Sequence, residues 1–175
     1  TEEQDKQYKV KLDSLIKEDK QNEKLAKETI FNKSGTEIKF YSNLNSMIDL
    51  DNTIANKANG IGLVRTENLI EEIEQIFDEE YQKKIYSRIC TSIYPNFVTF
   101  RLFDFGYDKL NLNKETENNP ALGQRGIRYL LENERILEIQ LRALLNSCTE
   151  GNLKILIPMV SNPEEIKLVK DYTLK

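Results

Sequence analysis

The chain alternates between amphipathic stretches and short apolar runs over most of its 175 residues. In the amphipathic stretches, apolar residues recur every three or four positions, which predicts helices over residues 48–58 and 71–93 and a helix within residues 130–148. Asn162 before Pro163 predicts the start of a fourth helix. The apolar runs lie between turn residues and are rich in β-branched and aromatic side chains, as strands are. They cover residues 37–43, 61–64, 97–103 and 153–160.

These predicted elements follow one another as strand, helix, strand, helix. The alternation predicts an α/β fold with a parallel sheet of about four strands. The run 61–64 follows a glycine turn and has no polar residue, so we expect it to be buried on both faces of the sheet. The run 153–160 is also expected to be a buried strand.

The first 35 residues follow a different pattern. Residues 1–31 are dense in charged and amide side chains, contain no Gly or Pro, and carry apolar residues at helical spacing. This pattern favours one long helix or a helical hairpin. Residues 33–36 (KSGT) are a turn signal. We therefore predict a helical linker over residues 1–35 and an α/β domain over residues 36–175.

The composition excludes several kinds of chemistry. The chain has no histidine, so it holds no Ser-His-Asp or Cys-His nucleophile system, no imidazole metal ligand and no phosphohistidine. Two cysteines are too few for a disulfide scaffold or a four-cysteine zinc site. Cys148 lies on the apolar stripe of its predicted helix, so we expect it to be a core residue and not a reactive thiol.

Charge and hydropathy limit the partners and the location. A net charge of −4 argues against a nucleic-acid-binding domain. The chain has no apolar run near the ~18 residues of a membrane span and no signal-peptide core, so we expect a cytoplasmic protein. It begins at Thr1 and not at methionine, which suggests a piece of a longer protein or an unrecorded start.

Arginines stand at the ends of two predicted strands. Arg65 follows the run 61–64, Arg101 lies within the run 97–103, and Arg125 and Arg128 come in the next segment. Arginine is scarce in this chain, with seven against eighteen lysines. Functional residues of parallel β/α proteins lie at the carboxyl ends of strands. The planar fork of arginine binds phosphate or carboxylate through two parallel hydrogen bonds, so these arginines are candidates for an anion site.

The residues alone leave a second interpretation open. The arginines could instead pair with acidic residues at the strand ends, for example Arg101 with Asp104. The segment Gly60-Ile61-Gly62 is too short for a phosphate loop. Asp104 and Asp108 are loop aspartates, which usually do not bind metal.

Five segments, in order, resemble the phosphoenolpyruvate-utilising enzymes. Residues 58–67 (ANGIGLVRTE) are similar to the strand GADGIGLFRTE of that family, and residues 100–109 (FRLFDFGYDK) are similar to its strand end RTLDIGGDK. Residues 119–128 (NPALGQRGIR) match its segment NPxLGxRGIR. Residues 141–145 and 155–159 are similar to its helix QLRAIL and its strand IMFPM. The order and spacing agree over most of the chain.

Within this family the chain most resembles enzyme I of the bacterial sugar phosphotransferase system, the phosphoenolpyruvate–protein phosphotransferases. Residues 106–109 (GYDK) and the stretch 78–86 carry this closer resemblance. Leu102 stands where those enzymes usually have threonine and leans towards pyruvate phosphate dikinase or phosphoenolpyruvate synthase. These two remain the alternatives within the family.

The resemblance implies an eight-stranded β/α (TIM) barrel that binds phosphoenolpyruvate and Mg²⁺ and usually dimerises. Such a barrel takes ~250 residues, so residues 36–175 would be its N-terminal part, with the helical linker before it. By motif, Arg65 and Arg101 would hold the phosphate and the carboxylate of the ligand, and Arg125 would join them at the barrel mouth.

The resemblance also implies that some parts lie outside this chain. No segment matches the acidic Mg²⁺ ligands or the cysteine acid of the family, so we expect no catalytic residue and no metal ligand here. The domain with the phosphoryl-accepting histidine, through which a phosphocarrier protein would bind, is missing too. The chain is therefore expected to be inactive alone and to form homo-oligomers. A standalone half-barrel binding or assembly module, or a remnant without a ligand, are the other hypotheses.

Overall fold

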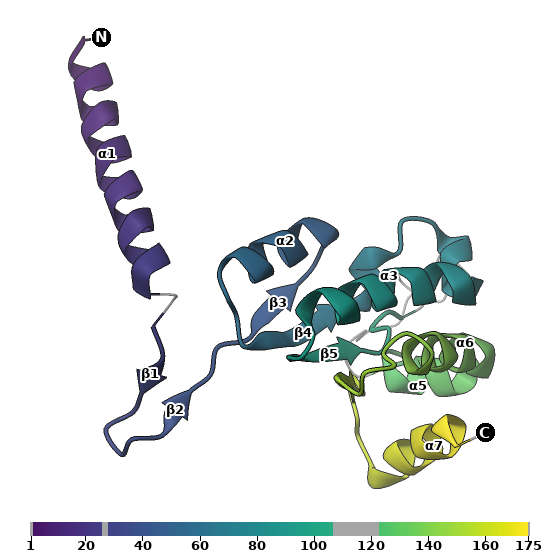
Figure 1. Ribbon diagram of the computed structural model, residues 1–175. Helices are drawn as coiled ribbons and strands as arrows, with labels where there is room; N and C mark the ends of the chain where they lie inside the picture. The colour runs from purple at the N-terminus through teal and green to yellow at the C-terminus, as the bar shows by residue number, and fades with distance from the viewer. Residues whose placement is uncertain (1, 26–27, 107–122, 175) are drawn as a thin grey trace.

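The computed structural model describes residues 2–25, 28–106 and 123–174, and a parallel sheet lies at its centre (Figure 1). Its four strands lie in the order β3-β4-β5-β6, and each neighbouring pair is parallel. Spatial order therefore equals chain order, as in successive β/α units of a barrel. This confirms the predicted α/β fold with four parallel strands. The strands are β3 (Ser42–Leu44), β4 (Gly60–Arg65), β5 (Phe97–Arg101) and β6 (Leu153–Leu156).

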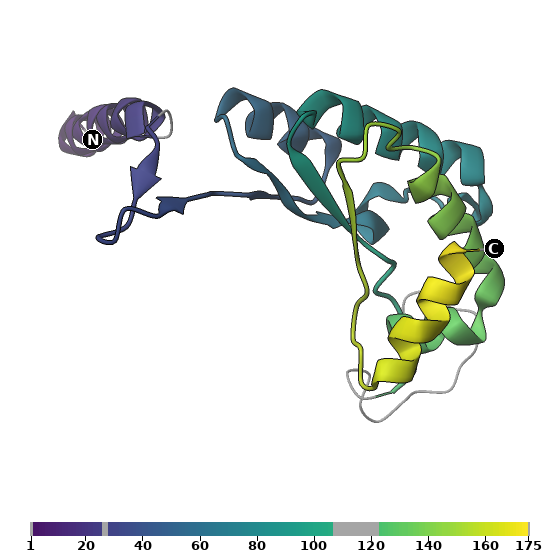
Figure 2. The ribbon, with the colours of Figure 1, turned by 60° about the horizontal axis from the view of Figure 1, so that its bottom comes forward.

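Helices cover one side of this sheet, which curves around an open inner side in Figure 2. Two short 3₁₀ helices, η1 (Thr66–Leu69) and η2 (Ile73–Phe77), follow β4. The longer helices are α2 (Met47–Ala55), α3 (Glu79–Ile93), α5 (Ile127–Glu132), α6 (Glu134–Leu145) and α7 (Pro163–Thr173).

The core lies between the helices and the covered face of the sheet. Along β5, Val98 and Phe100 are fully buried, whereas Phe97 is exposed and Thr99 is half-buried. The ring of Tyr86 on α3 packs edge-on against Phe100, with 5.1 Å between the ring centroids. This alternation is typical of a sheet with one covered face.

Two strands differ from their predicted burial because only one face is covered. The run 61–64 in β4 was expected to be buried on both faces, but within it only Ile61 and Val64 are buried, and Gly62 and Leu63 are half-buried. β6 was expected to be buried, but half-buried and exposed residues alternate along it. Both strands begin within one residue of their predicted starts, but β6 ends at Leu156 and not at residue 160, and the predicted burial is wrong in part.

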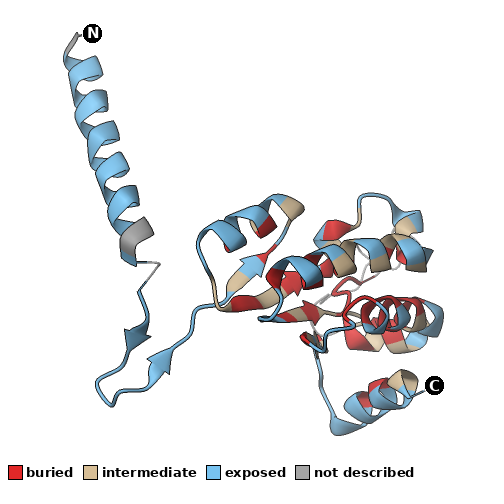
Figure 3. Cartoon of the chain, viewed as in Figure 1, coloured by how far each residue is buried: buried red, intermediate tan, exposed pale blue. Residues whose placement is uncertain are grey.

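The N-terminal segment is one helix followed by a small hairpin. Helix α1 (Glu2–Leu25) is one long helix, which is one of the two forms that the sequence predicts, the other being a helical hairpin. Its described side chains are exposed (Figure 3). Strands β1 (Ile30–Phe31) and β2 (Glu37–Ile38) then pair antiparallel across the predicted turn. The hairpin corrects the prediction, because residues 30–31 are not helical and the run 37–43 splits between β2 and β3. The linker boundary at residue 35 stays a prediction.

Helix α3 begins later than predicted, and α5 and α6 are separated by a short break. Helix α3 begins at Glu79 and not near residue 71, because the Asp78 side chain accepts a hydrogen bond from the Tyr81 backbone N–H and caps the helix there. The helix that the sequence predicts within residues 130–148 is α6, and Asn133 separates it from α5. The Asn133 side chain donates to the Tyr129 carbonyl at 2.9 Å, which satisfies one of the last carbonyls of α5.

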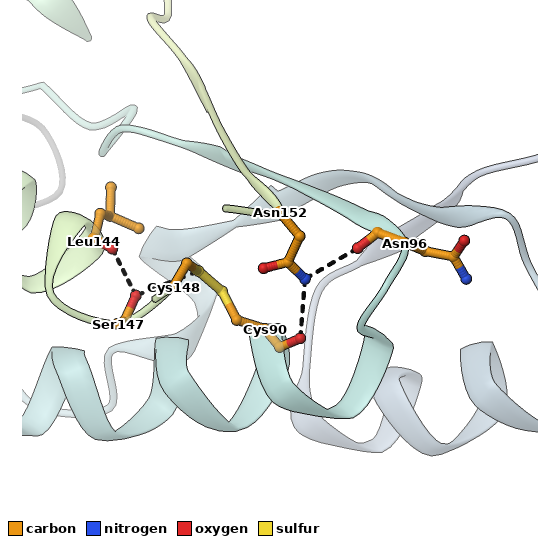
Figure 4. Close-up of a disulfide and its surroundings, with 6 residues drawn as sticks. All are labelled: Cys90, Asn96, Leu144, Ser147, Cys148 and Asn152. Atoms are coloured by element: carbon orange, nitrogen blue, oxygen red, sulfur yellow. Dashed lines mark hydrogen bonds between the residues drawn. A yellow bond between two sulfur atoms is a disulfide. The ribbon is translucent and has the colours of Figure 1, made fainter. Parts of the chain in front are cut away.

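Cys148 is buried, as predicted, and it is bonded to Cys90 of α3 (Figure 4). Their Cα atoms are 5.7 Å apart, within the usual range for a disulfide. Beside them, the Asn152 side chain donates to the carbonyls of Cys90 and Asn96, at 3.1 and 3.0 Å. These contacts fasten α3 to the beginning of β6.

Helix α7 begins where the sequence predicts, with Asn162 as its N-cap and Pro163 as its first residue. The Asn162 side chain accepts from the Glu165 backbone N–H at 3.1 Å. In return, the buried Glu165 carboxylate accepts from the backbone N–H and hydroxyl of Ser161, at 2.7 and 2.8 Å, and from the Asn162 N–H at 3.3 Å. This reciprocal capping box fixes the start of α7.

We expect Glu165→Gln to lower the free energy of unfolding by about 1 kcal/mol at neutral pH. Burial raises the pKa of the Glu165 carboxyl, but hydrogen bonds from Ser161 and Asn162 and the nearby Arg128 charge outweigh burial, so the net pKa is lowered. A carboxyl with a lowered folded-state pKa stabilises the protein above its unfolded value of 4.5, and this stabilisation is lost as the pH falls through the folded pKa. Urea unfolding at neutral and acidic pH measures the difference, with Glu164→Gln as the exposed control. A difference that grows in acid would contradict the assignment.

Among the described residues, none of the helices has both the length and the apolar character that crossing a bilayer requires.

Candidate functional site

The carboxyl ends of β4 and β5 place two of the predicted arginines side by side. Arg65 and Arg101 are register partners across the parallel pair, each as the last residue of its strand. Arg65 is exposed, whereas the Arg101 side chain is 19% exposed. Their placement at strand ends is as the sequence predicts.

Two carboxylates bind the guanidinium of Arg101. Its Nη1 lies 3.0 Å from Asp104 Oδ2, and its Nη2 forms an ion pair with Glu67 Oε1. Both acidic side chains are only 8% exposed. The pairing with Asp104 is the one that the sequence left open as an alternative to anion binding. In the structure, therefore, carboxylates orient Arg101.

Asp104 also binds Arg125, the third predicted arginine. Arg125 lies opposite Gly106 in an antiparallel bridge, and its Nε donates to Asp104 Oδ1 at 3.0 Å. Asp104 thus joins Arg101 and Arg125, which are separated by a segment only partly described. Asp108 and residues 119–122 of the NPALGQRGIR segment lie outside the described residues.

Arg128, the fourth arginine that the sequence singles out, binds two backbone carbonyls. Its Nε donates to the Gly123 carbonyl at 2.8 Å, and its Nη1 donates to the Met159 carbonyl at 3.0 Å. It therefore ties the segment after β6 to the start of α5.

We call Arg65, Arg101, Arg125, Glu67 and Asp104 the arginine cluster. Its three guanidinium groups and two carboxylates leave a net charge of +1. Arg101 Nε and Glu67 Oε2 are buried and have no hydrogen-bond partner among the described residues. A buried donor without a partner carries a desolvation cost that an added acceptor would remove. The cluster can therefore attract a small anion with oxygens that accept hydrogen bonds.

A buried polar network supports the cluster, and sequence reasoning missed it. Thr66 is fully buried, and its hydroxyl donates to the Arg101 carbonyl at 2.7 Å. Gln140 of α6 is fully buried as well, and its Nε2 donates to Thr66 Oγ1 at 3.0 Å. The signal in the sequence was a glutamine within the apolar stripe of a helix, next to Leu141 and three residues after Leu137.

The glycines of the 58–67 segment have a structural role at the opposite end of β4. Gly60 begins the strand and Arg65 ends it. At ~3.3 Å per residue, Gly60 lies roughly 16 Å from Arg65. A Cβ on Gly62 would lie 2.9 Å from the Cβ of Tyr41, so glycine leaves space for that side chain. This agrees with the conclusion that Gly60-Ile61-Gly62 is no phosphate loop.

In the described ranges, no three His, Cys, Asp or Glu side chains gather into a group that could hold a metal ion. The two carboxylates of the arginine cluster are bound to guanidinium groups. The described residues therefore do not fit a Mg²⁺ site.

Comparison with known proteins identifies a family and several relatives. The family model described as PEP-utilising enzyme, PEP-binding domain, matches residues 19–175. The phosphoenolpyruvate-protein phosphotransferase of Listeria innocua is 35% identical over 177 aligned positions, which cover 99% of this chain and 31% of that protein. The Bacillus subtilis protein of the same name is 34% identical, covering 97% of this chain and 30% of its own length. A multiphosphoryl transfer protein of Shigella flexneri is 32% identical over 93% of this chain and 20% of its own length.

The chain thus spans about a third of the length of the phosphotransferases that it matches.

Proposed function

Because this chain belongs to the phosphoenolpyruvate-utilising enzymes through their PEP-binding domain, we propose that its arginine cluster holds phosphoenolpyruvate. In this proposal the chain forms part of the barrel of a phosphoenolpyruvate–protein phosphotransferase. The observation that carries it is that Arg101 and Arg125 both bind Asp104, just beyond the carboxyl end of β5. Arg65 at the end of β4 is the register partner of Arg101.

The chemistry of the ligand suits the cluster. Phosphoenolpyruvate carries a phosphate and a carboxylate, and each matches the planar fork of an arginine. Phosphoryl transfer places charge on the transferring oxygens, and positioned cations stabilise that charge. Glu67 and Asp104 hold the Arg101 guanidinium in place before any ligand arrives. Little reorganisation would then be needed on binding.

The family resemblance implies Mg²⁺, which the described residues do not fit, so we derive no step through it. We propose that its ligands lie outside this chain. The chain has no histidine to accept a phosphoryl group. We therefore propose that it does not transfer phosphate alone, and that a phosphocarrier protein binds to another part of the longer protein. A cytoplasmic location and a homo-oligomer complete this proposal.

One observation favours a second candidate function, that of an assembly module. Among the described residues, β3 and β6 each lack a neighbour on their outer edge. The sheet face without helices keeps Phe97 and Leu156 exposed, at 45% and 38%. Unpaired edges and exposed apolar side chains favour association with another chain. Sedimentation of the purified chain tests this, and a stable monomer would contradict it.

Titration with phosphoenolpyruvate tests the primary proposal. We expect weak binding by the chain, and we expect Arg101→Lys to raise the Kd at least about tenfold, because lysine keeps the charge but loses the planar fork. Calorimetry or NMR titration measures the Kd. Arg142→Lys is the matched control, since Arg142 pairs with Glu79 and its side chain is 56% exposed. Equal Kd values for Arg101→Lys and wild type would refute the role of Arg101.

A further inference from the structure

We propose that Gln140 is a positioning residue that sets the spacing between the ends of β4 and β5 and so aligns the arginine cluster. This inference rests on the proposed binding of phosphoenolpyruvate by that cluster. Gln140 belongs to α6, and its side chain forms hydrogen bonds with Thr66, Phe103 and Tyr86, which are not arginines. Its effect would act through the two strand ends.

The Gln140 amide bridges the two strand ends directly. Its Oε1 accepts from the Phe103 backbone N–H at 3.0 Å, beyond the end of β5. Its Nε2 donates to Thr66 Oγ1 at 3.0 Å, just beyond the end of β4. Gln140, Thr66 and Phe103 are all fully buried, so water does not compete for these bonds.

In the sequence, Thr66 and Phe103 are adjacent to charged residues of the arginine cluster. Thr66 lies between Arg65 and Glu67, and Phe103 directly precedes Asp104. A shift of either backbone segment would move a guanidinium or a carboxylate of the cluster. Thr66 adds a third link, because its hydroxyl donates to the Arg101 carbonyl at 2.7 Å. One amide thus fixes both strands at the positions that carry the charges.

The hydrogen bonds around Gln140 allow only one orientation of its amide. The Nε2 of Gln82 donates to the carbonyls of Gln75 and Ile76, at 3.0 and 2.8 Å, so its Oε1 is left to accept from the Tyr86 hydroxyl at 3.3 Å. The Tyr86 oxygen then accepts from Gln140 Nε2 at 3.5 Å. Burial raises the pKa of the Tyr86 hydroxyl, which therefore remains a donor. Since Phe103 N–H requires an acceptor, a flipped Gln140 amide would face it with a donor.

An apolar residue would be the simpler choice if this position served packing alone. Gln140 lies among buried apolar residues of α6, and burying an amide costs free energy unless all its hydrogen bonds are made. Leucine has a similar volume and would add to the core. The Gln140 amide instead bonds to Phe103 and Thr66 at the two strand ends and to Tyr86 of α3, which favours a role in positioning.

The test compares Gln140→Leu with Asn152→Leu. Asn152 is the control because it is another buried amide with hydrogen-bond partners. Its two bonds go to the carbonyls of Cys90 and Asn96, and it lies at the start of β6, at the opposite end of the sheet. Both variants are expected to lower the Tm. The specific readouts are the NMR signal of Arg101 Nε–H and the Kd for phosphoenolpyruvate with the whole 175-residue chain.

For Gln140→Leu we expect the Arg101 Nε–H to exchange with water at least about tenfold faster and the Kd to rise about tenfold. For Asn152→Leu we expect both values to stay within about twofold of the wild type, because its hydrogen bonds do not reach the cluster. Equal changes in the two variants, or an unchanged Arg101 signal in Gln140→Leu, would overturn the proposal. If the wild type shows no phosphoenolpyruvate binding, the proposed function fails, while the exchange of Arg101 Nε–H still decides the role of Gln140.

Gln140→Glu serves where the leucine variant does not fold. A buried carboxyl has a raised pKa, so it is protonated at about pH 5 and ionised at about pH 9. Protonated, it can accept from Phe103 N–H and donate to Thr66 Oγ1. Ionised, it cannot donate, and Thr66 must turn its hydroxyl away from the Arg101 carbonyl. We expect a wild-type Arg101 signal at the lower pH and an altered one at the higher pH. A signal that matches the wild type at both would refute the role of Gln140.

Discussion

Replacing Asp104 by asparagine is expected to lower the Tm by roughly 6–12 °C and to make the chain more responsive to inorganic phosphate. Asp104 is shared by Arg101 and Arg125 and its side chain is only 8% exposed. Removing its charge leaves two guanidinium groups without their common partner, at a cost of about 3 kcal/mol. The net charge of the cluster rises by one unit. A phosphate dianion can then take the place of the carboxylate, and its binding stabilises the folded chain.

The measurement is the Tm at rising phosphate concentration and constant ionic strength. Glu79→Gln is the matched control, since it also removes a carboxylate from an arginine, but from the exposed pair with Arg142. We expect that control to lose at most about 1 kcal/mol and to show the wild-type response to phosphate. A variant Asp104→Asn that is destabilised but no more responsive than Glu79→Gln would mean that the carboxylate only balances charge within the fold.

The fold was predictable where hydrophobic patterns coincide with buried contacts. The runs that became β4 and β5 bury Ile61, Val64 and Phe100 against the helices, and this burial is what their apolar pattern indicates. The hairpin β1–β2 was not predictable in this way, because its apolar residues Ile30, Phe31 and Ile38 remain exposed and do not belong to the buried core. The start of α3 at Glu79 depended on a single side-chain cap at Asp78, which competes with an apolar pattern that continues upstream.

The arginines of the site were predictable from the sequence, and so was one of their acidic partners, Asp104, as the alternative to anion binding. The scarcity of arginine and its position at strand ends pointed to Arg65 and Arg101, and the family resemblance added Arg125. The structure places Arg65 and Arg101 at the carboxyl ends of β4 and β5, and Arg125 binds Asp104 just beyond β5. The other contacts of the site join residues that lie far apart in the chain. Glu67 pairs with Arg101, 34 positions away, and Gln140 contacts Thr66, 74 positions away. Local patterns do not record such contacts.

Gly60→Ala is expected to lower the free energy of unfolding by about 4 kcal/mol, the largest loss among the variants considered. Gly60 has a φ of +140°, where a side chain is strained, and an added Cβ would lie 2.5 Å from the Phe97 carbonyl oxygen. Gly60 and Phe97 are register partners between β4 and β5, so the carbonyl cannot retreat without opening the sheet. Strain and overpacking each contribute about 1–3 kcal/mol, and urea unfolding measures their sum.

Gly151→Ala separates these two contributions. Gly151 also has a positive φ, +77°, but an added Cβ there meets no atom within 4 Å. It should therefore lose only about 1 kcal/mol, from backbone strain. Similar losses in both variants would contradict the close approach at Gly60. Gly60 also lies at the opposite end of β4 from Arg65, so the folded fraction of Gly60→Ala should bind phosphoenolpyruvate as the wild type does. A stable Gly60→Ala variant that has lost this binding would instead place the glycine in the anion site.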